Sequence, residues 1–212
     1  HKDPGSNLLL KREVVRKQKR HTVIEKIEGD AWARPFSLAL GVTDDELTPW
    51  RDLFFTSSDS IFMVEGPIDK EYFEMLQAEE HGHSRFKFEG EIFPYEGWSS
   101  LTNSLLIRFI KNKYKRVVIS VDLDALPQVE RTLQSLGMKR DFDYLPLGID
   151  SPGRRFIEGY LDDAIINAVH SSNTDLVRAL SSDNKEEVKK AKQNLKEKYL
   201  AEFKKMAKTG TK

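Results

Sequence analysis

The chain has 212 residues, of which 39% are hydrophobic and 32% are charged, so it can bury a core beneath a heavily charged surface. It contains no cysteine, which excludes disulfides and thiolate metal sites. It has neither an apolar run of about 18 residues nor a secretory signal, so we expect no membrane span and a cytoplasmic location.

The formal net charge is zero, but the charges are segregated along the sequence. Residues 10–28 carry seven Lys/Arg against three Glu, and residues 185–212 carry ten Lys against four Glu. Residues 59–100 carry ten Asp/Glu against three Lys/Arg. An acidic middle is suited to cations and basic ends are suited to phosphates, although solvated helix faces explain the same counts.

The first six residues, His-Lys-Asp-Pro-Gly-Ser, resemble the end of an expression tag, and no initiator Met is present. We therefore expect the natural chain to begin further upstream. Residues 7–28 mix apolar positions with Lys and Arg and are predicted to form a helix. With the less regular stretch that follows, which has a helix-start pattern at Thr43, they make an expected N-terminal helical segment over residues 7–54.

Short apolar runs alternate with helical patterns from residue 60 onward. Strands are predicted at residues 60–64, 92–94, 117–121 and 144–147, and helices at residues 69–77, 101–113, 127–136 and 156–169. This alternation predicts an α/β domain with a parallel sheet flanked by helices, in which functional groups gather at the carboxyl ends of the strands.

The tail from Asn184 onward has apolar residues at spacings of three and four, which predicts a long amphipathic helix. No strand pattern accompanies it. We therefore assign residues 171–212 to an additional helical appendage, beside which the predicted N-terminal helix can pack.

Two acidic motifs follow predicted strands. Glu65 closes the first strand and Asp69 opens the next helix, with Gly66 allowing a sharp turn between them. Asp122 and Asp124 follow a later strand, and on an extended backbone their side chains share one face. If the two strands are neighbours, four carboxylates converge at one edge of the sheet.

Converging carboxylates repel one another unless a cation compensates them. Mg²⁺ prefers oxygen ligands, and two such ions about 4 Å apart can stabilise the attacking and leaving oxygens of a phosphoryl displacement. Either motif alone is equally explained by a solvated turn or a helix N-terminus. The two together, each after a buried strand, favour a site for Mg²⁺ or Mn²⁺.

These motifs resemble the Toprim domain of topoisomerases, primases and several nucleases. The closer resemblance is to the overcoming-lysogenization-defect (OLD) family of nucleases, whose Toprim domain has a Val-Glu-Gly-x-x-Asp stretch like Val64–Asp69 and an Asp-x-Asp strand like Val117–Asp124. The resemblance covers residues 55–170. It implies a nuclease domain in which Glu65, Asp69 and Asp122 bind one metal and Asp124 helps to bind a second.

The resemblance implies further site residues. A later acidic ligand is best matched by Glu158, with Asp162 and Asp163 as weaker candidates, and Ser120 is placed to orient a metal-bound water. A catalytic lysine near the end of the chain is also implied, for which Lys204, Lys205 and Lys208 are candidates that spacing does not separate. For each one alone, a place on a solvated helix face is the more common role.

The family pairs this domain with an N-terminal ABC-type ATPase. The sequence contains no Walker A pattern, so we expect it to be the nuclease half of a longer, ATP-dependent protein.

Several other side chains are candidates for contacts with nucleic acid or metal. Arg154 and Arg155 can bind a phosphate or be ordinary loop charges. Trp98 can stack on an unpaired base, but packing at a turn is the more common role. The remaining candidates are the basic stretch 11–20 for a DNA backbone, the pair His81 and His83 for metal, and His170 as a structural residue.

Three functions compete. The first is a DNA nuclease dependent on Mg²⁺ or Mn²⁺, and the second is a non-catalytic Toprim-like module that binds DNA or a partner. The third is a phosphatase of the haloacid dehalogenase type. That family places its Asp-x-Asp on the first strand, followed by Thr or Val where this chain has Leu126, so the third reading is disfavoured.

Overall fold

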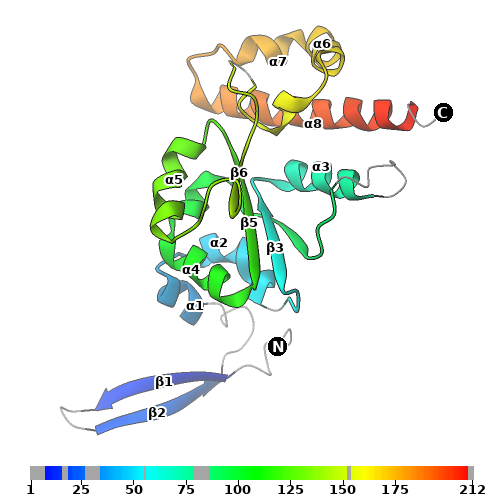
Figure 1. The fold of residues 1–212 in the computed structure, drawn as a ribbon. Coiled ribbons are helices and arrows are strands. Elements are labelled where there is room, and N and C mark those ends of the chain that lie inside the picture. Colours follow the sequence, from blue (N-terminus) through cyan, green and yellow to red (C-terminus); the bar gives the residue numbers. More distant parts are fainter. Residues whose placement is uncertain are drawn as a thin grey trace.

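The computed structural model describes residues 8–15, 19–26, 34–54, 56–78, 86–151 and 154–209, so the tag-like residues 1–6 lie outside it. At its centre is a four-stranded sheet in the order β4-β3-β5-β6 (Figure 1). The strands are β3 (Ser60–Val64), β4 (Glu91–Pro94), β5 (Arg116–Asp122) and β6 (Tyr144–Leu147). All neighbouring pairs are parallel, which confirms the expected α/β class.

Both faces of the sheet are buried, which explains the continuous apolar character of its strands. Ile61 and Met63 in β3 belong to the larger hydrophobic cluster, whereas Phe62 and Val64 belong to a smaller cluster on the other face. Side chains alternate in direction along a strand, so a strand between two helical layers is mostly apolar on both of its sides.

Helices that precede and helices that follow Glu65 in the sequence cover the two faces of the sheet. The larger cluster is closed by α2 (Asp44–Leu47), η3 (Thr48–Phe54), α4 (Ser104–Lys113) and α5 (Leu126–Ser135). The short helix α1 (Arg34–Leu40) adds Leu40 to that side. The smaller cluster is closed by α3 (Pro67–Gln77) through Phe73 and Leu76.

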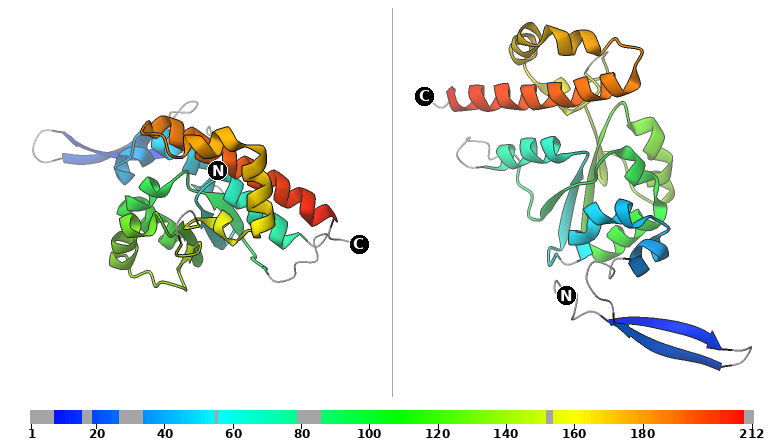
Figure 2. Two further views of the ribbon diagram at one scale, coloured as in Figure 1. Left: turned by 90° about the horizontal axis from the view of Figure 1, so that it is seen from above. Right: turned by 180° about the vertical axis from the view of Figure 1, so that it is seen from behind.

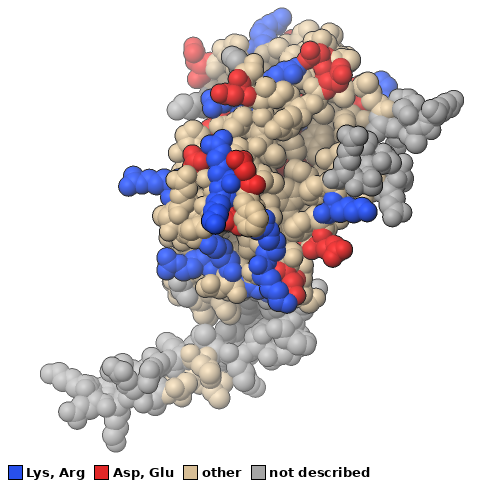
Figure 3. Space-filling model, in the orientation of Figure 1, with Lys and Arg blue, Asp and Glu red and all other residues tan. Residues whose placement is uncertain are grey.

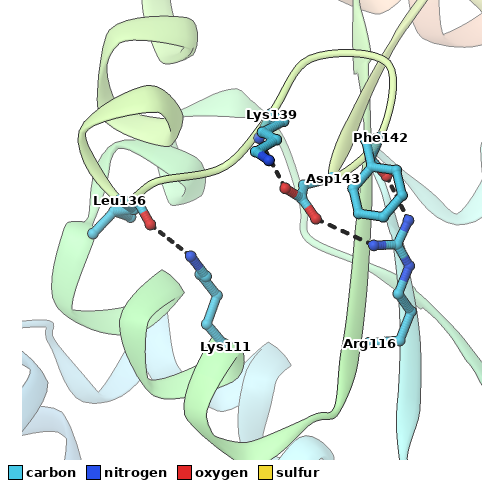
Figure 4. A network of polar contacts seen from close by, with 6 residues as sticks. All are labelled: Lys111, Arg116, Leu136, Lys139, Phe142 and Asp143. Atoms are coloured by element: carbon cyan, nitrogen blue, oxygen red, sulfur yellow. Dashed lines mark hydrogen bonds and ion pairs between the residues drawn. The ribbon is translucent and has the colours of Figure 1, made fainter.

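Polar contacts fix β5 and β6 at the edge of the sheet where their strands begin (Figure 4). The Arg116 guanidinium lies 4.1 Å from the Phe142 ring centroid, donates to the Phe142 carbonyl at 2.6 Å and pairs with Asp143 at 3.2 Å. The other Asp143 oxygen accepts from the Lys139 backbone N–H at 2.8 Å, and the Lys111 ammonium donates to the Leu136 carbonyl. This network ties the loop before β6 to the start of β5.

A helical cap lies over the opposite edge, where the strands end (Figure 1). It consists of η6 (Ile157–Tyr160), α6 (Asp163–Ser172), α7 (Thr174–Ala179) and α8 (Lys185–Thr209). Val169, Leu195 and Tyr199 form its own buried cluster. The boundary expected at residue 170 therefore falls inside α6, and the tail helix packs with the helices before it over the sheet edge.

The prediction of a helix for residues 7–28 is wrong, because the chain forms a β-hairpin there. Strand β1 (Leu8–Val15) pairs antiparallel with β2 (Lys19–Lys26), from Leu8 opposite Lys26 to Val15 opposite Lys19. The β-branched residues of these strands favour extended backbone. The hairpin projects from the end of the molecule opposite α8, so the expected packing against the tail helix is also wrong (Figure 2).

Two predicted helices are interrupted by caps. The side chain of Asn103 accepts from the backbone N–H groups of Leu105 and Leu106 and starts α4, which separates it from η5 (Trp98–Thr102). Asp162 caps α6 in the same way at the Ala164 N–H, so the helix predicted for residues 156–169 splits into η6 and α6. Among the helices in the described ranges, none is long and apolar enough to cross a membrane.

Candidate active site

Glu65 and Asp69 lie at the end of β3, as the sequence predicts. The Gly97 N–H donates to the Glu65 carbonyl at 3.2 Å, which fixes the backbone just beyond the strand. One carboxylate oxygen of Asp69, Oδ2, accepts from the Gly66 N–H at 2.8 Å and so closes the first turn of α3. The other oxygen, Oδ1, is buried without a hydrogen-bond partner and is left for the site.

Asp122 and Asp124 differ in their surroundings. Asp122 is the last residue of β5, the neighbour of β3, and is 5% exposed. The chain then turns, so Asp124 is exposed and the expected extended geometry, with both side chains on one strand face, is wrong. The Asp124 N–H donates to the Arg155 carbonyl at 3.2 Å, and this bond brings the loop of Arg155 to the same edge of the sheet.

Glu158 joins the cluster from that loop. It is 1% exposed, and neither of its carboxylate oxygens has a hydrogen-bond partner. Close backbone approaches require glycine nearby: a Cβ on Gly148, whose φ is +116°, would lie 2.6 Å from the backbone of Phe156, and a Cβ on Gly159 would meet the Arg154 carbonyl. Glu158 is thus held by a loop that packs tightly against itself.

The weaker acidic candidates have other roles. Asp162 is the N-cap of α6, and Asp163 is exposed and pairs with Arg154. Both side chains serve the start of α6.

Lys196, which no sequence motif singles out, lies among the carboxylates. Its ammonium nitrogen is 3.8 Å from Asp69 Oδ1 and 3.8 Å from Asp122 Oδ2. It projects from α8 directly after the buried Leu195 and three residues before the buried Tyr199. A lysine that borders the apolar stripe of an amphipathic helix is the signal that could have identified it.

Burial raises the pKa of Glu65, Asp69 and Asp122, and it raises the pKa of Glu158 to about 7. The positive charge of Lys196 acts in the opposite direction on each of them. An interaction with the Asp122 side chain also lowers the pKa of Glu65, whereas the charges of Asp69 and Asp124 raise it.

Burial lowers the pKa of Lys196, but the surrounding carboxylates raise it further than burial lowers it. The lysine therefore stays charged. Because one ammonium faces several carboxylates, the cluster holds an excess of negative charge at neutral pH or retains protons.

Two tyrosines and a serine line the base of the cluster. The Tyr95 hydroxyl is buried and donates to the Ser120 carbonyl at 3.0 Å. The Ser120 hydroxyl donates to the Met63 carbonyl at 3.2 Å, so its proton is used between β5 and β3. The Tyr72 hydroxyl is buried without a hydrogen-bond partner, and burial raises its pKa, with a further contribution from Glu158.

The donor set suits a hard divalent cation, although the side chains are not yet arranged as ligands. Within the described residues, no three Asp, Glu or His side chains converge closely enough to hold a metal as they stand. Glu65, Asp69 and Glu158 nevertheless each keep at least one buried oxygen without a partner. Such oxygens are costly unless a cation or a proton satisfies them, so the residues fit Mg²⁺ or Mn²⁺ in chemistry.

Two of the three lysines proposed from the tail form ion pairs with other residues. Lys204 pairs with Glu71 of α3, and Lys205 pairs with Glu202 at 3.2 Å on its own helix. Lys208 lies in α8, but its side chain is outside the described part of the chain.

The candidate nucleic-acid contacts are spread around the site. Arg154 is engaged with Asp163, Arg155 is half exposed and lies 3.4 Å from Asp150, and Trp98 is 41% exposed on η5. His170 shares a 2.6 Å hydrogen bond with the Tyr199 hydroxyl, as a structural residue would. His81, His83 and the side chains of the basic stretch 11–20 lie outside the described part of the structure.

Comparison with protein-family models gave no match. Comparisons with curated proteins and with solved structures likewise gave none. The functional assignment therefore depends on the residues at the sheet edge and on the motif resemblance described above.

Proposed function

We propose that the chain is a nuclease domain that hydrolyses DNA phosphodiester bonds with Mg²⁺ or Mn²⁺, two ions being expected. One observation carries this proposal: acidic side chains from three distant segments, the buried Asp69, Asp122 and Glu158 and the half-buried Glu65, lie together around Lys196. A scaffold gains no stability from concentrating buried carboxylates, whereas a cation site needs them.

The position of each residue indicates the role that it would have in binding metal or substrate. Glu65, Asp69 and Asp122 would hold one cation, and Asp124, which is exposed beside them, would share in holding a second, with Glu158 completing the set. Bound metal would supply a polarised phosphoryl oxygen and an activated water. Lys196, freed from Asp69 and Asp122 as metal binds, would donate a hydrogen bond to a phosphate oxygen and stabilise the charge that develops there.

The choice of DNA as substrate rests on the resemblance to the Toprim nucleases. The same resemblance supports an ABC-type ATPase as a partner domain. Neither follows from the geometry of the sheet edge alone.

The proposal is tested by plasmid cleavage in Mg²⁺, Mn²⁺ or EDTA. We expect nicking or linearisation with either metal and none in EDTA. Asp122→Asn and Glu65→Gln, which keep the side-chain shape, should each reduce the rate by about a hundredfold or more. Asp175→Asn, at an exposed position on α7, is the matched control and should leave the rate unchanged. Cleavage that persists in EDTA or in both site variants would contradict the assignment.

One observation favours a second function, a non-catalytic Toprim-like module that binds DNA or a partner. Lys196 already forms ion pairs with Asp69 and Asp122, and an internal ammonium can replace a metal permanently. DNA binding without cleavage in either metal would support this alternative.

A further inference from the structure

A cavity of about 360 Å³ opens directly beside the carboxylates. Asp122, Asp124 and Lys196 form part of its wall, so whatever fills it lies next to the candidate site. The rest of the wall comes from the helical cap, chiefly from α8 and from the loop before η6. The cavity therefore lies between the edge of the sheet and the helical cap.

The inner wall of the cavity is apolar and partly aromatic. Phe156, Leu180, Leu195 and Tyr199 contribute to it. The Tyr199 hydroxyl is hydrogen-bonded to His170, so one polar group is held in place within an otherwise apolar surface. Small-molecule pockets are typically lined in this way, by apolar and aromatic side chains with a few placed polar groups, and a flat heteroaromatic ring can pack on such a wall.

Besides Lys196, two further positive side chains belong to the same wall. Arg155 and Lys192 are both exposed, and Lys192 lies one helical turn before Lys196 on α8. Cations beside an apolar wall favour a ligand that carries negative charge next to a flat apolar group. A nucleotide satisfies both requirements.

The volume restricts the form in which a nucleotide can enter. The cavity is at the small end of the range of roughly 300–1,000 Å³ found for ligand sites, which is enough for one nucleotide and too little for a base pair. A base inside a duplex is paired and stacked, so it reaches such a cavity only after it is unpaired or when the strand is single.

We propose that this cavity binds one unpaired nucleotide of the substrate strand, with its base against Phe156 and its phosphate near Lys192, so that the protein acts on single-stranded or unpaired DNA. This inference rests on the proposed function, since the phosphate next along the strand would then lie at Asp122 and Lys196. It assigns a substrate class that the carboxylates themselves do not specify.

The test is equilibrium binding of labelled oligonucleotides by the full chain in Ca²⁺, with their integrity checked on a gel. The ligands are a 12-nucleotide oligo-dT strand, an abasic strand with the same number of phosphates, a blunt 12-base-pair duplex and free thymidine monophosphate. We expect the oligo-dT strand to bind about tenfold more tightly than the abasic strand and the duplex, because only it offers unpaired bases.

Two variants distinguish the contribution of the base to binding from the contribution of the phosphate. Phe156→Leu keeps an apolar side chain but removes the ring, and it should abolish the preference for oligo-dT over the abasic strand. Lys192→Glu should weaken the binding of both single strands about tenfold. Lys190→Ala, at an exposed position of the same helix away from the cavity wall, should bind as the wild type does.

Equal affinity for oligo-dT and abasic strands would overturn the proposal, as would unchanged binding in both variants. Binding of the free mononucleotide without binding of the strand would assign the cavity to a small molecule and overturn it as well. These outcomes are distinct from a failure of the nuclease assignment. A chain that prefers oligo-dT but cuts no DNA in any metal keeps the nucleotide pocket and loses the hydrolytic function.

Discussion

At the scale of single residues, the position of Lys196 determines how much of the negative charge of the acidic cluster is neutralised. Its ammonium lies 3.8 Å from both Asp69 and Asp122, which leaves Glu65 and Glu158 with buried oxygens that have no partner. A single positive charge cannot neutralise all of these groups. The cluster must therefore take up protons or cations to reach balance.

The buried carboxyl of Glu158 predicts how stability depends on pH in the absence of metal. Its pKa is raised from 4.5 to about 7, so the folded state holds its proton more tightly than the unfolded state. Stability is therefore fully present below pH 4.5 and falls as pH rises to about 7, by on the order of 3 kcal/mol. Urea unfolding in EDTA between pH 5 and 8 measures this decline. Glu158→Gln should flatten the profile, and an equally steep profile in that variant would exclude Glu158 as the cause.

Removal of Lys196 should uncover the repulsion between the carboxylates. We expect Lys196→Met to lower the free energy of unfolding in EDTA by roughly 3 kcal/mol, because the loss of one partner leaves buried charge uncompensated. Mn²⁺ should restore most of the lost stability. Lys204→Met removes a more exposed ion pair with Glu71 and should cost about 1 kcal/mol or less. Thermal melting with and without Mn²⁺ compares the two variants, and equal losses would show that Lys196 is an ordinary surface cation.

Sequence patterns identified the acidic residues better than the lysine. Glu65, Asp69 and Asp122 follow strands whose apolar runs are readable, and parallel strands end at one edge. Asp124 was placed on an extended backbone, but the chain turns after Asp122. Lys196 was missed because the spacing of a helix shows which residues border its apolar side and does not show what that side covers.

At the scale of elements, α8 connects the cap to the sheet. Leu195 and Tyr199 pack into the cluster of the cap, while farther along the helix Lys204 pairs with Glu71 and Phe203 lies 5.6 Å from the ring of Tyr72. The helix is thus held against α6, α7 and α3. These contacts are long-range, so the sequence predicted the helix itself and could not predict where it docks.

The sequence predicts strands correctly where both faces of the sheet are buried, because a continuous apolar run then distinguishes a strand from an amphipathic helix. The central positions of β3 are all apolar, and those of β5 are apolar except for Ser120, so a short apolar run suffices to predict each strand. In residues 7–28 the apolar positions are irregular and the Lys and Arg between them suit a helix as well as a hairpin. In the structure, residues 8–15 pair with residues 19–26 and form the hairpin. The spacing of apolar residues along the chain does not show such pairing between strands.

The docking of α8 predicts a large cost for a core substitution in it. Leu195 is 2% exposed, and Leu195→Ala should lower the free energy of unfolding by about 2–5 kcal/mol through lost packing and a cavity. Leu105→Ala, at a leucine that is 47% exposed on α4, should change it by about 0.5 kcal/mol or less. Urea denaturation of the two variants checks this difference. Similar small effects would mean that the cap does not pack as a folded unit.

At the scale of the whole molecule, the structure redistributes the charges that are segregated along the sequence. On the face in Figure 3, Lys and Arg side chains lie among Asp and Glu side chains over the body of the molecule. The imbalance of charge is instead concentrated beneath the cap, where Glu65, Asp69, Asp122 and Glu158 lie around Lys196. Charge counts along a chain indicate acidic and basic segments, and only the fold shows which of those charges are concentrated.

Calorimetric titration of the metal-free protein with Mn²⁺ most directly tests whether this internal cluster is a cation site. We predict saturable binding of Mn²⁺, with release of protons from carboxyls whose pKa is raised by burial, detected by repeating the titration in buffers of different ionisation enthalpy. Asp122→Asn should abolish the binding, whereas Asp175→Asn should leave it intact. Absence of saturable binding in the wild type, or binding that is unchanged by Asp122→Asn, would contradict a metal site at this edge of the sheet.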